Sequence, residues 1–259
     1  MAADAHRQRI ERAFTDQASA FEDRRFNRVF TADATWVFER LPRGRDDLAL
    51  DVAAGTGHAA RQLAADVRAV VAVDATDAML RRGREAALAD GCRNVVFLRG
   101  DAADLPFPDG SFDLAVCRFA VHHFERPEAP LAEMGRCVRA GGRLAVADLV
   151  ADADPAIAAV QNELERQRDP SHVRMLGADE LRDLVSAVGW ADVSVECRAL
   201  TRPLAPWLEQ AHTDPEVADR IRARLEEEIG GGPLTGFAPR RVDGEIWFAQ
   251  TFASCIGSA

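Results

Sequence analysis

The stretch Asp51-Val52-Ala53-Ala54-Gly55-Thr56-Gly57 closes a short apolar run that begins at Leu48 and leads into a segment with a helical pattern. An apolar run of this length, bounded by a glycine-rich turn, predicts a buried strand. Gly55 and Gly57 allow a tight turn and a close approach of a ligand to the backbone, and the following helix presents unpaired N–H groups. We therefore expect a nucleotide-like ligand at a strand–turn–helix junction.

Strand and helix patterns alternate along the rest of the chain. We expect strands at residues 69–74, 94–99, 112–117, 143–149, 193–200 and 244–255. We expect helices at residues 58–65, 77–89, 128–138, 155–168 and 178–188, with two more before Gly230. Such alternation predicts an α/β fold with a mostly parallel sheet and helices on both faces. The uninterrupted apolar residues 69–73 agree, because the strands of such a sheet are covered on both sides.

The N-terminal segment has a different character. Residues 5–40 combine charged and apolar side chains at helical spacing, with Phe14, Phe21 and Phe26 among the bulky ones, which predicts helices. Leu41-Pro42-Arg43-Gly44 then breaks the pattern. We expect a helical cap at residues 1–44 and a main domain at 45–259. Within that domain, residues 45–150 form the core, and residues 151–259 supply C-terminal helices and the last two strands.

The composition excludes several classes of protein. A formal net charge of −10 over 259 residues would repel a phosphate backbone, so nucleic acid is not an expected partner. No apolar run is long enough to span a bilayer, no apolar block opens the chain, and the five cysteines are scattered; together these features predict a cytoplasmic protein without membrane insertion. The chain has neither lysine nor tyrosine, which rules out Schiff-base, phosphate-loop-lysine and Tyr/Lys proton-transfer chemistry.

The glycine motif alone leaves the ligand open. With Ala60 it reads G-x-G-x-x-A, and Asp74 ends the next strand where a ribose-binding carboxylate belongs, so a nicotinamide-dependent oxidoreductase fits. However, Asp51 precedes the glycines, where it would repel a pyrophosphate and attract an ammonium or sulfonium group. Asp101 closes the third strand, where it can accept a hydrogen bond from an adenine amino group. These acids favour a nucleoside that carries an amino acid.

Together with Leu105–Asp113 and Gly141-Gly142, these residues resemble the class I S-adenosylmethionine-dependent methyltransferases. Within that class the chain is similar to the group that contains the ubiquinone/menaquinone-biosynthesis C-methyltransferases. The resemblance implies a Rossmann-like, seven-stranded, mostly parallel sheet, S-adenosyl-L-methionine as cofactor, and methyl transfer to carbon, oxygen or nitrogen of a small-molecule acceptor. One departure is Ala53, which stands where the family usually has its first glycine.

The resemblance also implies a set of cofactor-binding residues. Asp51 and Gly55 would face the methionine part, Asp74 the ribose hydroxyls, and Asp101 the adenine. The other members of the set are Ala53, Gly57, Ala75, Met79, Ala102, Cys117 and Arg118. Ordinary packing and strand-end solvation are the alternative explanations for all of these positions.

Candidates for catalysis follow the fourth strand and the fifth. His123, in the pair His122-His123, is the expected general base if the acceptor loses a proton. His172 and Arg174 are expected near the acceptor, where an arginine fork can bind a carboxylate or phosphate; packing histidines and a solvated loop are the alternatives. Asp148, at the end of the fifth strand, is a further acceptor-side candidate. The histidines lack metal-ligand spacing, so no metal is expected, and a non-catalytic nucleoside-binding protein stays open.

Overall fold

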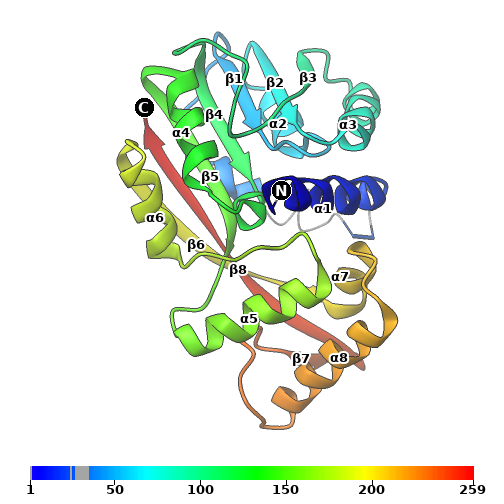
Figure 1. The fold of residues 1–259 in the computed structure, drawn as a ribbon. Helices are drawn as coiled ribbons and strands as arrows, with labels where there is room; N and C mark the ends of the chain where they lie inside the picture. Colours follow the sequence, from blue (N-terminus) through cyan, green and yellow to red (C-terminus); the bar gives the residue numbers. More distant parts are fainter. Residues whose placement is uncertain (1, 24, 27–34) are drawn as a thin grey trace.

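The computed structural model describes residues 2–23, 25–26 and 35–259 and has an α/β architecture (Figure 1). Its strands are β1 (Leu48–Val52), β2 (Ala69–Asp74), β3 (Val95–Arg99), β4 (Phe112–Arg118), β5 (Val138–Val150), β6 (Ala191–Pro203), β7 (Arg240–Val242) and β8 (Glu245–Ser258). They form one sheet in the order β3-β2-β1-β4-β5-β8-β6, with β7 paired to β8. Strands β1 to β5 are parallel, and β8 runs antiparallel between β5 and β6.

The expected fold is confirmed, including the mostly parallel sheet that the last two long strands complete at one edge. The helices that follow β1 along the chain are α2 (His58–Ala64), α3 (Asp77–Ala89), α4 (Glu128–Cys137), α5 (Pro155–Arg168), α6 (Ala178–Ala187), α7 (Leu204–Gln210) and α8 (Pro215–Ile229). Two strands differ most from expectation. β5 begins at Val138 rather than at residue 143, and the short β7 was not expected, because three residues carry too little alternation to be recognised.

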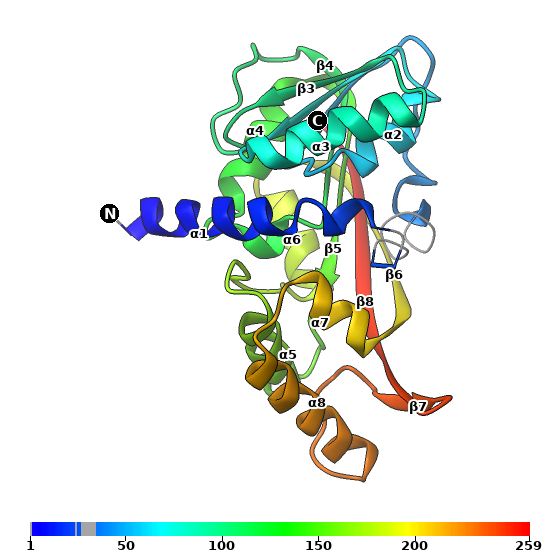
Figure 2. The ribbon, with the colours of Figure 1, turned by 90° about the vertical axis from the view of Figure 1, so that its right-hand side faces the viewer.

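Helices cover both faces of the sheet (Figures 1 and 2), and the sheet separates two apolar layers. On one face, α2 and α3 pack against strand residues such as Ala49, Val70 and Val116. On the other face, α4 and α6 pack against the alternating residues, such as Leu50 and Ala115. Because neighbouring residues of one strand point to opposite faces, strands buried on both sides need the continuous apolar runs that the sequence contains.

The C-terminal helices build a third apolar cluster beyond the sheet's main body. Helices α5, α7 and α8 pack around Trp207, Phe237 and Phe248 at the start of the long β8. Figure 1 shows these helices and β7 as the lower part of the molecule, joined to the upper part by the long strands β6 and β8. This part therefore lies beyond the carboxyl ends of the parallel strands.

The N-terminal helix α1 (Ala2–Gln17) lies between these two parts (Figure 1). Two short 3-10 helices, η1 (Ala20–Glu22) and η3 (Thr35–Phe38), follow it. Residues 1, 24 and 27–34 of the expected helical cap lie outside the described residues. Arg61 of α2 donates a hydrogen bond of 2.7 Å to Glu22, which ties η1 to the helix that follows the glycine turn. No helix in the described part of the chain is long and apolar enough to span a membrane.

Candidate active site

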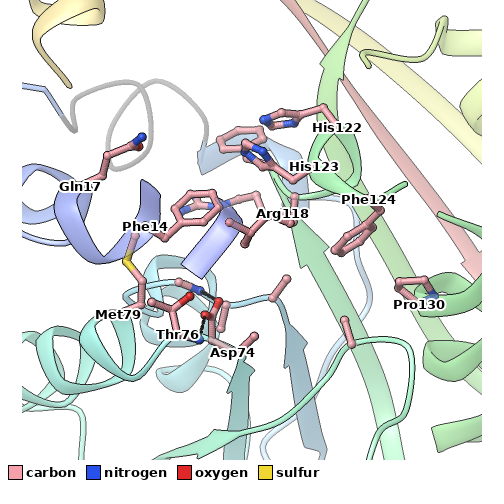
Figure 3. Close-up of a pocket in the computed structure, with 18 of the residues that line it drawn as sticks. Phe14, Gln17, Asp74, Thr76, Met79, Arg118, His122, His123, Phe124 and Pro130 are labelled. Carbon is pink, nitrogen blue, oxygen red and sulfur yellow. Dashed lines mark hydrogen bonds between the residues drawn. The ribbon is translucent and has the colours of Figure 1, made fainter. Parts of the chain in front are cut away.

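A cavity of about 690 Å³ opens at the carboxyl ends of β1, β2, β4 and β5 (Figure 3). It is lined by these strand ends, by α1 and by residues of α5, α7 and β8. In Figure 3, Asp74 and Met79 lie at one end, His122 and His123 lie at the other, and Arg118 lies between them. Open α/β sheets bind ligands in the crevice at this edge, and most of the residues expected from the sequence line this cavity.

The turn after β1 gives the cavity its backbone wall. Ala53, Gly55 and Gly57 all have positive φ angles, of 54°, 56° and 75°. A Cβ on Gly55 would have no atom within 4 Å, whereas a Cβ on Gly57 would lie 2.7 Å from the ring of Phe97. Gly55 therefore leaves room beside the backbone for a ligand. Gly57 does not line the cavity and instead allows the turn to pack against β3.

The carboxylate of Asp51 is buried next to this turn, and only one of its two oxygens accepts a hydrogen bond. Its side chain is 1% exposed, and Oδ2 accepts a hydrogen bond of 2.9 Å from the backbone N–H of Ala60. Oδ1 has no hydrogen-bond partner, and the buried hydroxyl of Thr56, which lines the same cavity, has none either. Burial raises the pKa of Asp51 from 3.8 to about 7, against the opposing charge of Arg118. Two oxygens that lack donors fit a ligand with an ammonium group, as S-adenosylmethionine has.

Asp74, at the end of β2, spans the same turn. Its Oδ2 accepts a hydrogen bond of 2.8 Å from the N–H of Gly55, and its Oδ1 accepts one of 2.8 Å from the N–H of Thr76. Burial raises the pKa of this carboxyl, and the two N–H donors oppose that rise. Each carboxylate oxygen has a second lone pair that can accept from a ligand hydroxyl, so Asp74 both shapes the turn and faces the cavity.

The remaining expected cofactor residues fall into two groups. Ala75, Met79, Asp101, Ala102 and Arg118 line the cavity, as do Ala53 and Gly55. Cys117 does not: it is buried within β4, and burial raises the pKa of its thiol well above 9.0. Its side chain packs into the face of the sheet that α4 covers, because side chains alternate along a strand and Arg118 takes the cavity side.

At the end of the cavity opposite Asp74, the expected acceptor end, a histidine is held by a carboxylate. His122 Nδ1 lies 2.5 Å from Asp148 Oδ1, and the backbone N–H of His122 donates to Asp148 Oδ2 over 2.9 Å. Both side chains are buried, at 8% and 2% exposure, and His122 lines the cavity. Burial lowers the pKa of His122, but the charge and hydrogen bond of Asp148 outweigh it, so the pKa is raised overall. Since Nδ1 is bound to the carboxylate, Nε2 is the nitrogen available to a ligand.

His123 lines the cavity too, but its surroundings differ. Its Nδ1 lies 3.1 Å from the carbonyl oxygen of Ser171, and its ring contacts Phe14 of α1 edge-on at 4.9 Å between centroids. Burial and the neighbouring His122 lower its pKa to about 4. The nearest carboxylate, Asp169, hydrogen-bonds Ser171. His123 is therefore a much weaker base than His122.

His172 and Arg174, expected near the acceptor, do not line the cavity. His172 is buried behind His122, 5.4 Å between ring centroids, and its Nε2 donates to Asn162 Oδ1 over 3.1 Å. Burial is the main cause that lowers its pKa to about 2. Arg174 is half-exposed and forms an ion pair with Glu180, 2.6 Å between Nη2 and Oε1. Because Arg174 pairs with Glu180 at the surface, its guanidinium does not extend into the cavity.

Several cavity residues were missed by sequence reasoning. They include Thr56 within the glycine turn and, from distant parts of the chain, His6, Gln17, Asp169, Trp207 and Gln250. Only Thr56 had a signal, its place inside the motif. Within the described ranges, no group of three His, Cys, Asp or Glu residues is arranged to hold a metal ion.

Comparison with known proteins assigns this site to a family. The methyltransferase domain family matches residues 50–146. The chain is also 35% identical to the uncharacterized methyltransferase YcgJ of Bacillus subtilis (strain 168) over 176 residues, which cover 68% of this chain and 70% of that protein. The chain belongs to the S-adenosylmethionine-dependent methyltransferases. Its cofactor is therefore S-adenosylmethionine, and the oxidoreductase interpretation of the glycine motif is set aside.

Other relatives of this methyltransferase agree. A demethylmenaquinone methyltransferase of Clavibacter sepedonicus is 31% identical over 162 residues, 62% of this chain and 63% of that protein. The crystal structure of a putative methyltransferase from Bacillus halodurans C-125 superposes with a TM-score of 0.78 at 26% identity, covering 88% of this chain and 98% of that one. The family match ends at residue 146, so the methyltransferase core is shared, whereas α5, α7 and β8 lie outside the matched segment.

Proposed function

We propose that this methyltransferase transfers a methyl group to a small-molecule acceptor that loses a proton, at a hydroxyl oxygen or an activated carbon, with His122 as the general base. The observation that carries the proposal is the buried hydrogen bond of 2.5 Å between His122 Nδ1 and Asp148 Oδ1. When bound, S-adenosylmethionine supplies the methyl group from its sulfonium. The chain's own task is to orient the acceptor, exclude water and accept a proton.

Asp148 prepares His122 for this role in two ways. It holds the imidazole in the tautomer with hydrogen on Nδ1, which leaves the Nε2 lone pair for the acceptor. Its charge also stabilises the imidazolium that forms when Nε2 takes the proton. Asp148 itself accepts from the backbone N–H groups of His122 and Leu149, so the carboxylate is held in place before any ligand binds. An amine that is already unprotonated needs no such base, which favours a proton-bearing acceptor.

A small molecule fits the cavity better than a macromolecule does. The space is about 690 Å³ and is covered by α1, a volume typical of small-molecule sites. Its acceptor end combines the aromatic side chains of Phe14, Trp207 and Phe252 with the polar group of His122. Relatives named demethylmenaquinone methyltransferase support a quinol-like, aromatic acceptor, and a quinol ionises in the required way.

The cofactor end has matching roles. We assign Asp51 Oδ1 and Thr56 Oγ1 to the methionine ammonium, because both lack donors. Asp74 is assigned to the ribose hydroxyls, Asp101 and Ala102 to the adenine edge, and Met79 to the apolar side of the adenosine. The charge of Arg118 persists although burial lowers its pKa to about 10, and it lies beside Asp51 at the point where the two ends of the cavity meet.

Methyl transfer from radiolabelled S-adenosylmethionine to a panel of naphthoquinols, phenols and amines tests this proposal. We expect transfer to naphthoquinols or phenols, a loss of about 10²- to 10⁴-fold in kcat in His122→Gln, and a smaller loss in Asp148→Asn. The wild-type acid limb of kcat/KM should lie above pH 6.5, the ordinary histidine pKa, because Asp148 raises that of His122. It should move to lower pH in Asp148→Asn, which keeps the hydrogen bond but removes the charge.

Two controls separate this role from a structural one. His123→Gln changes the neighbouring imidazole and should leave the acid limb where it is, since its pKa is about 4. Binding of S-adenosylhomocysteine, followed by calorimetry, shows whether each variant still forms the cofactor end. Transfer to amines alone, or an acid limb that Asp148→Asn does not move, refutes His122 as the base.

A further inference from the structure

The acceptor end of the cavity contains another buried oxygen without a partner. Gln250 of β8 is 3% exposed, it lines the cavity, and its Oε1 accepts no hydrogen bond. Leaving a buried carbonyl oxygen without a donor costs about 1–3 kcal/mol. A group in this state at a cavity wall is explained when the ligand brings the missing donor.

The neighbours of Gln250 determine which atom of its side-chain amide remains available to a ligand. Its Nε2 donates to Glu165 Oε1 over 2.7 Å, and Glu165 is itself buried, at 2% exposure. Turning the amide would bring Oε1 against the carboxylate, an acceptor facing an acceptor, so the observed orientation is the stable one. Oε1 is therefore the atom that remains for a ligand.

Glu165 in turn is held by a rigid partner. Arg168 donates from Nη1 to Glu165 Oε2 over 3.2 Å and from Nε to the carbonyl oxygen of Trp207 over 3.1 Å. Its guanidinium lies 4.5 Å from the centroid of the Trp207 ring. Three elements, α5, α7 and β8, thus converge to position one amide oxygen, an arrangement typical of a recognition site rather than of accidental packing.

The sheet register separates Gln250 from the reacting end. Ala253 of β8 is the residue paired with Asp148 of β5, and Gln250 lies three positions before it. Three residues of strand span about 10 Å. Both residues line the same cavity, so one ligand can contact His122 and Gln250 together.

We propose that Gln250 is a specificity-determining residue whose Oε1 accepts a hydrogen bond from a hydroxyl or N–H group of the acceptor, remote from the methylated atom. This inference rests on the proposed function, because it assigns this end of the cavity to the acceptor. The acceptor then carries two donors: one gives its proton to His122 during the reaction, and the other is kept and binds Gln250. A molecule with only carbonyl oxygens at the remote end is excluded by repulsion from Oε1.

Binding of two matched probes tests the inference without any turnover. The probes are a bis-phenol with one hydroxyl on each of two linked rings and its di-O-methyl ether, titrated into protein saturated with S-adenosylhomocysteine. In wild type we expect the bis-phenol to bind at least about tenfold more tightly than the ether. In Gln250→Leu its Kd should rise about tenfold while that of the ether stays the same or falls. Gln167→Leu, at an exposed glutamine of α5, is the control and should change neither.

The comparison of two probes on two proteins isolates the Gln250 contact, because contacts of the bis-phenol with His122 are common to both. A crystal structure of the bis-phenol complex, with a hydroxyl within hydrogen-bond distance of Gln250 Oε1, tests the inference even if Gln250→Leu does not fold. Equal binding of the two probes, a bis-phenol Kd unchanged by Gln250→Leu, or no binding of either probe overturns it. Failure of His122 as the base would appear only in the methyl-transfer assay, so the two results are distinguishable.

Discussion

Replacing Asp51 with asparagine should stabilise the free protein. Burial raises the pKa of this carboxyl from 3.8 to about 7, so the folded protein binds the proton more tightly than the unfolded chain does. The stability linked to that proton is fully present below the unfolded pKa of 3.8 and is lost as the pH rises to about 7. Above that pH the ionised carboxylate costs about 4 kcal/mol, at about 1.4 kcal/mol for each pKa unit.

Asparagine carries no charge at any pH, and its side-chain oxygen can still accept the hydrogen bond from Ala60. The gain in the free energy of unfolding of Asp51→Asn over wild type should therefore be small near pH 4 and approach about 4 kcal/mol at about pH 8. Urea unfolding, followed by circular dichroism at several pH values, measures this difference. Asp46→Asn, at an exposed carboxylate of the loop before β1, is the matched control.

The same substitution should weaken cofactor binding. An asparagine oxygen lacks the negative charge that attracts an ammonium group, a loss of about 1.5–3 kcal/mol, or about 10- to 100-fold in the Kd of S-adenosylhomocysteine. Calorimetry at about pH 8 measures it. A variant whose gain in stability does not grow with pH would show that the buried-charge reasoning is wrong. Unchanged affinity would show that Asp51 does not bind the ammonium group.

Four further substitutions concern the glycine turn and the loop between α5 and α6. Gly57→Ala should lower the free energy of unfolding by more than about 2 kcal/mol in urea, because its Cβ would lie 2.7 Å from Phe97; Gly55→Ala should cost only about 1 kcal/mol yet abolish calorimetric binding of S-adenosylhomocysteine. Ala53→Gly should raise the unfolding free energy by up to about 1 kcal/mol, since φ is +54° there, and an unchanged urea midpoint would contradict this. Arg174→Ala should change methyl transfer by less than about twofold because its ion pair lies outside the cavity, whereas a tenfold loss would return it to the acceptor site.

Most of the residues that line the expected cofactor end of the cavity could be predicted from sequence, because they follow the order of the strands. Asp51, Asp74 and Asp101 each come directly after an apolar run, and parallel strands bring such positions to one edge of the sheet. No knowledge of side-chain packing is needed for this step. The exception is Cys117. Side chains along β4 alternate between the cavity and the core, and the sequence alone does not show to which of the two Cys117 points.

The acceptor end could not be predicted in the same detail, because it depends on packing between distant segments. His122 and His123 are adjacent, and only the position of the loop after β4 relative to β5 decides which of them meets Asp148. Gln250 is a polar residue in an apolar strand, a pattern also found in edge strands that face water. Its role depends on Glu165, 85 residues away, and nothing in the local pattern of either segment indicates that they meet.

Unpartnered oxygens provide a criterion for ligand contacts that does not use family membership. Asp74 and Asp148 each have both oxygens bound by protein N–H groups, whereas Asp51 Oδ1 and Gln250 Oε1 have no donor although both are buried in the wall of one cavity. At Asp51 the criterion selects a residue inside the segment that matches the methyltransferase family, where a cationic cofactor explains the missing donor. Applied to the C-terminal part, which lies outside the residues 50–146 that match the methyltransferase domain family, the same criterion selects Gln250. A phosphate site offers hydrogen-bond donors to a ligand that brings acceptors. Here Asp51 Oδ1 and Gln250 Oε1 are acceptors that lack donors, so the ligand at each end of the cavity must bring an N–H or O–H group.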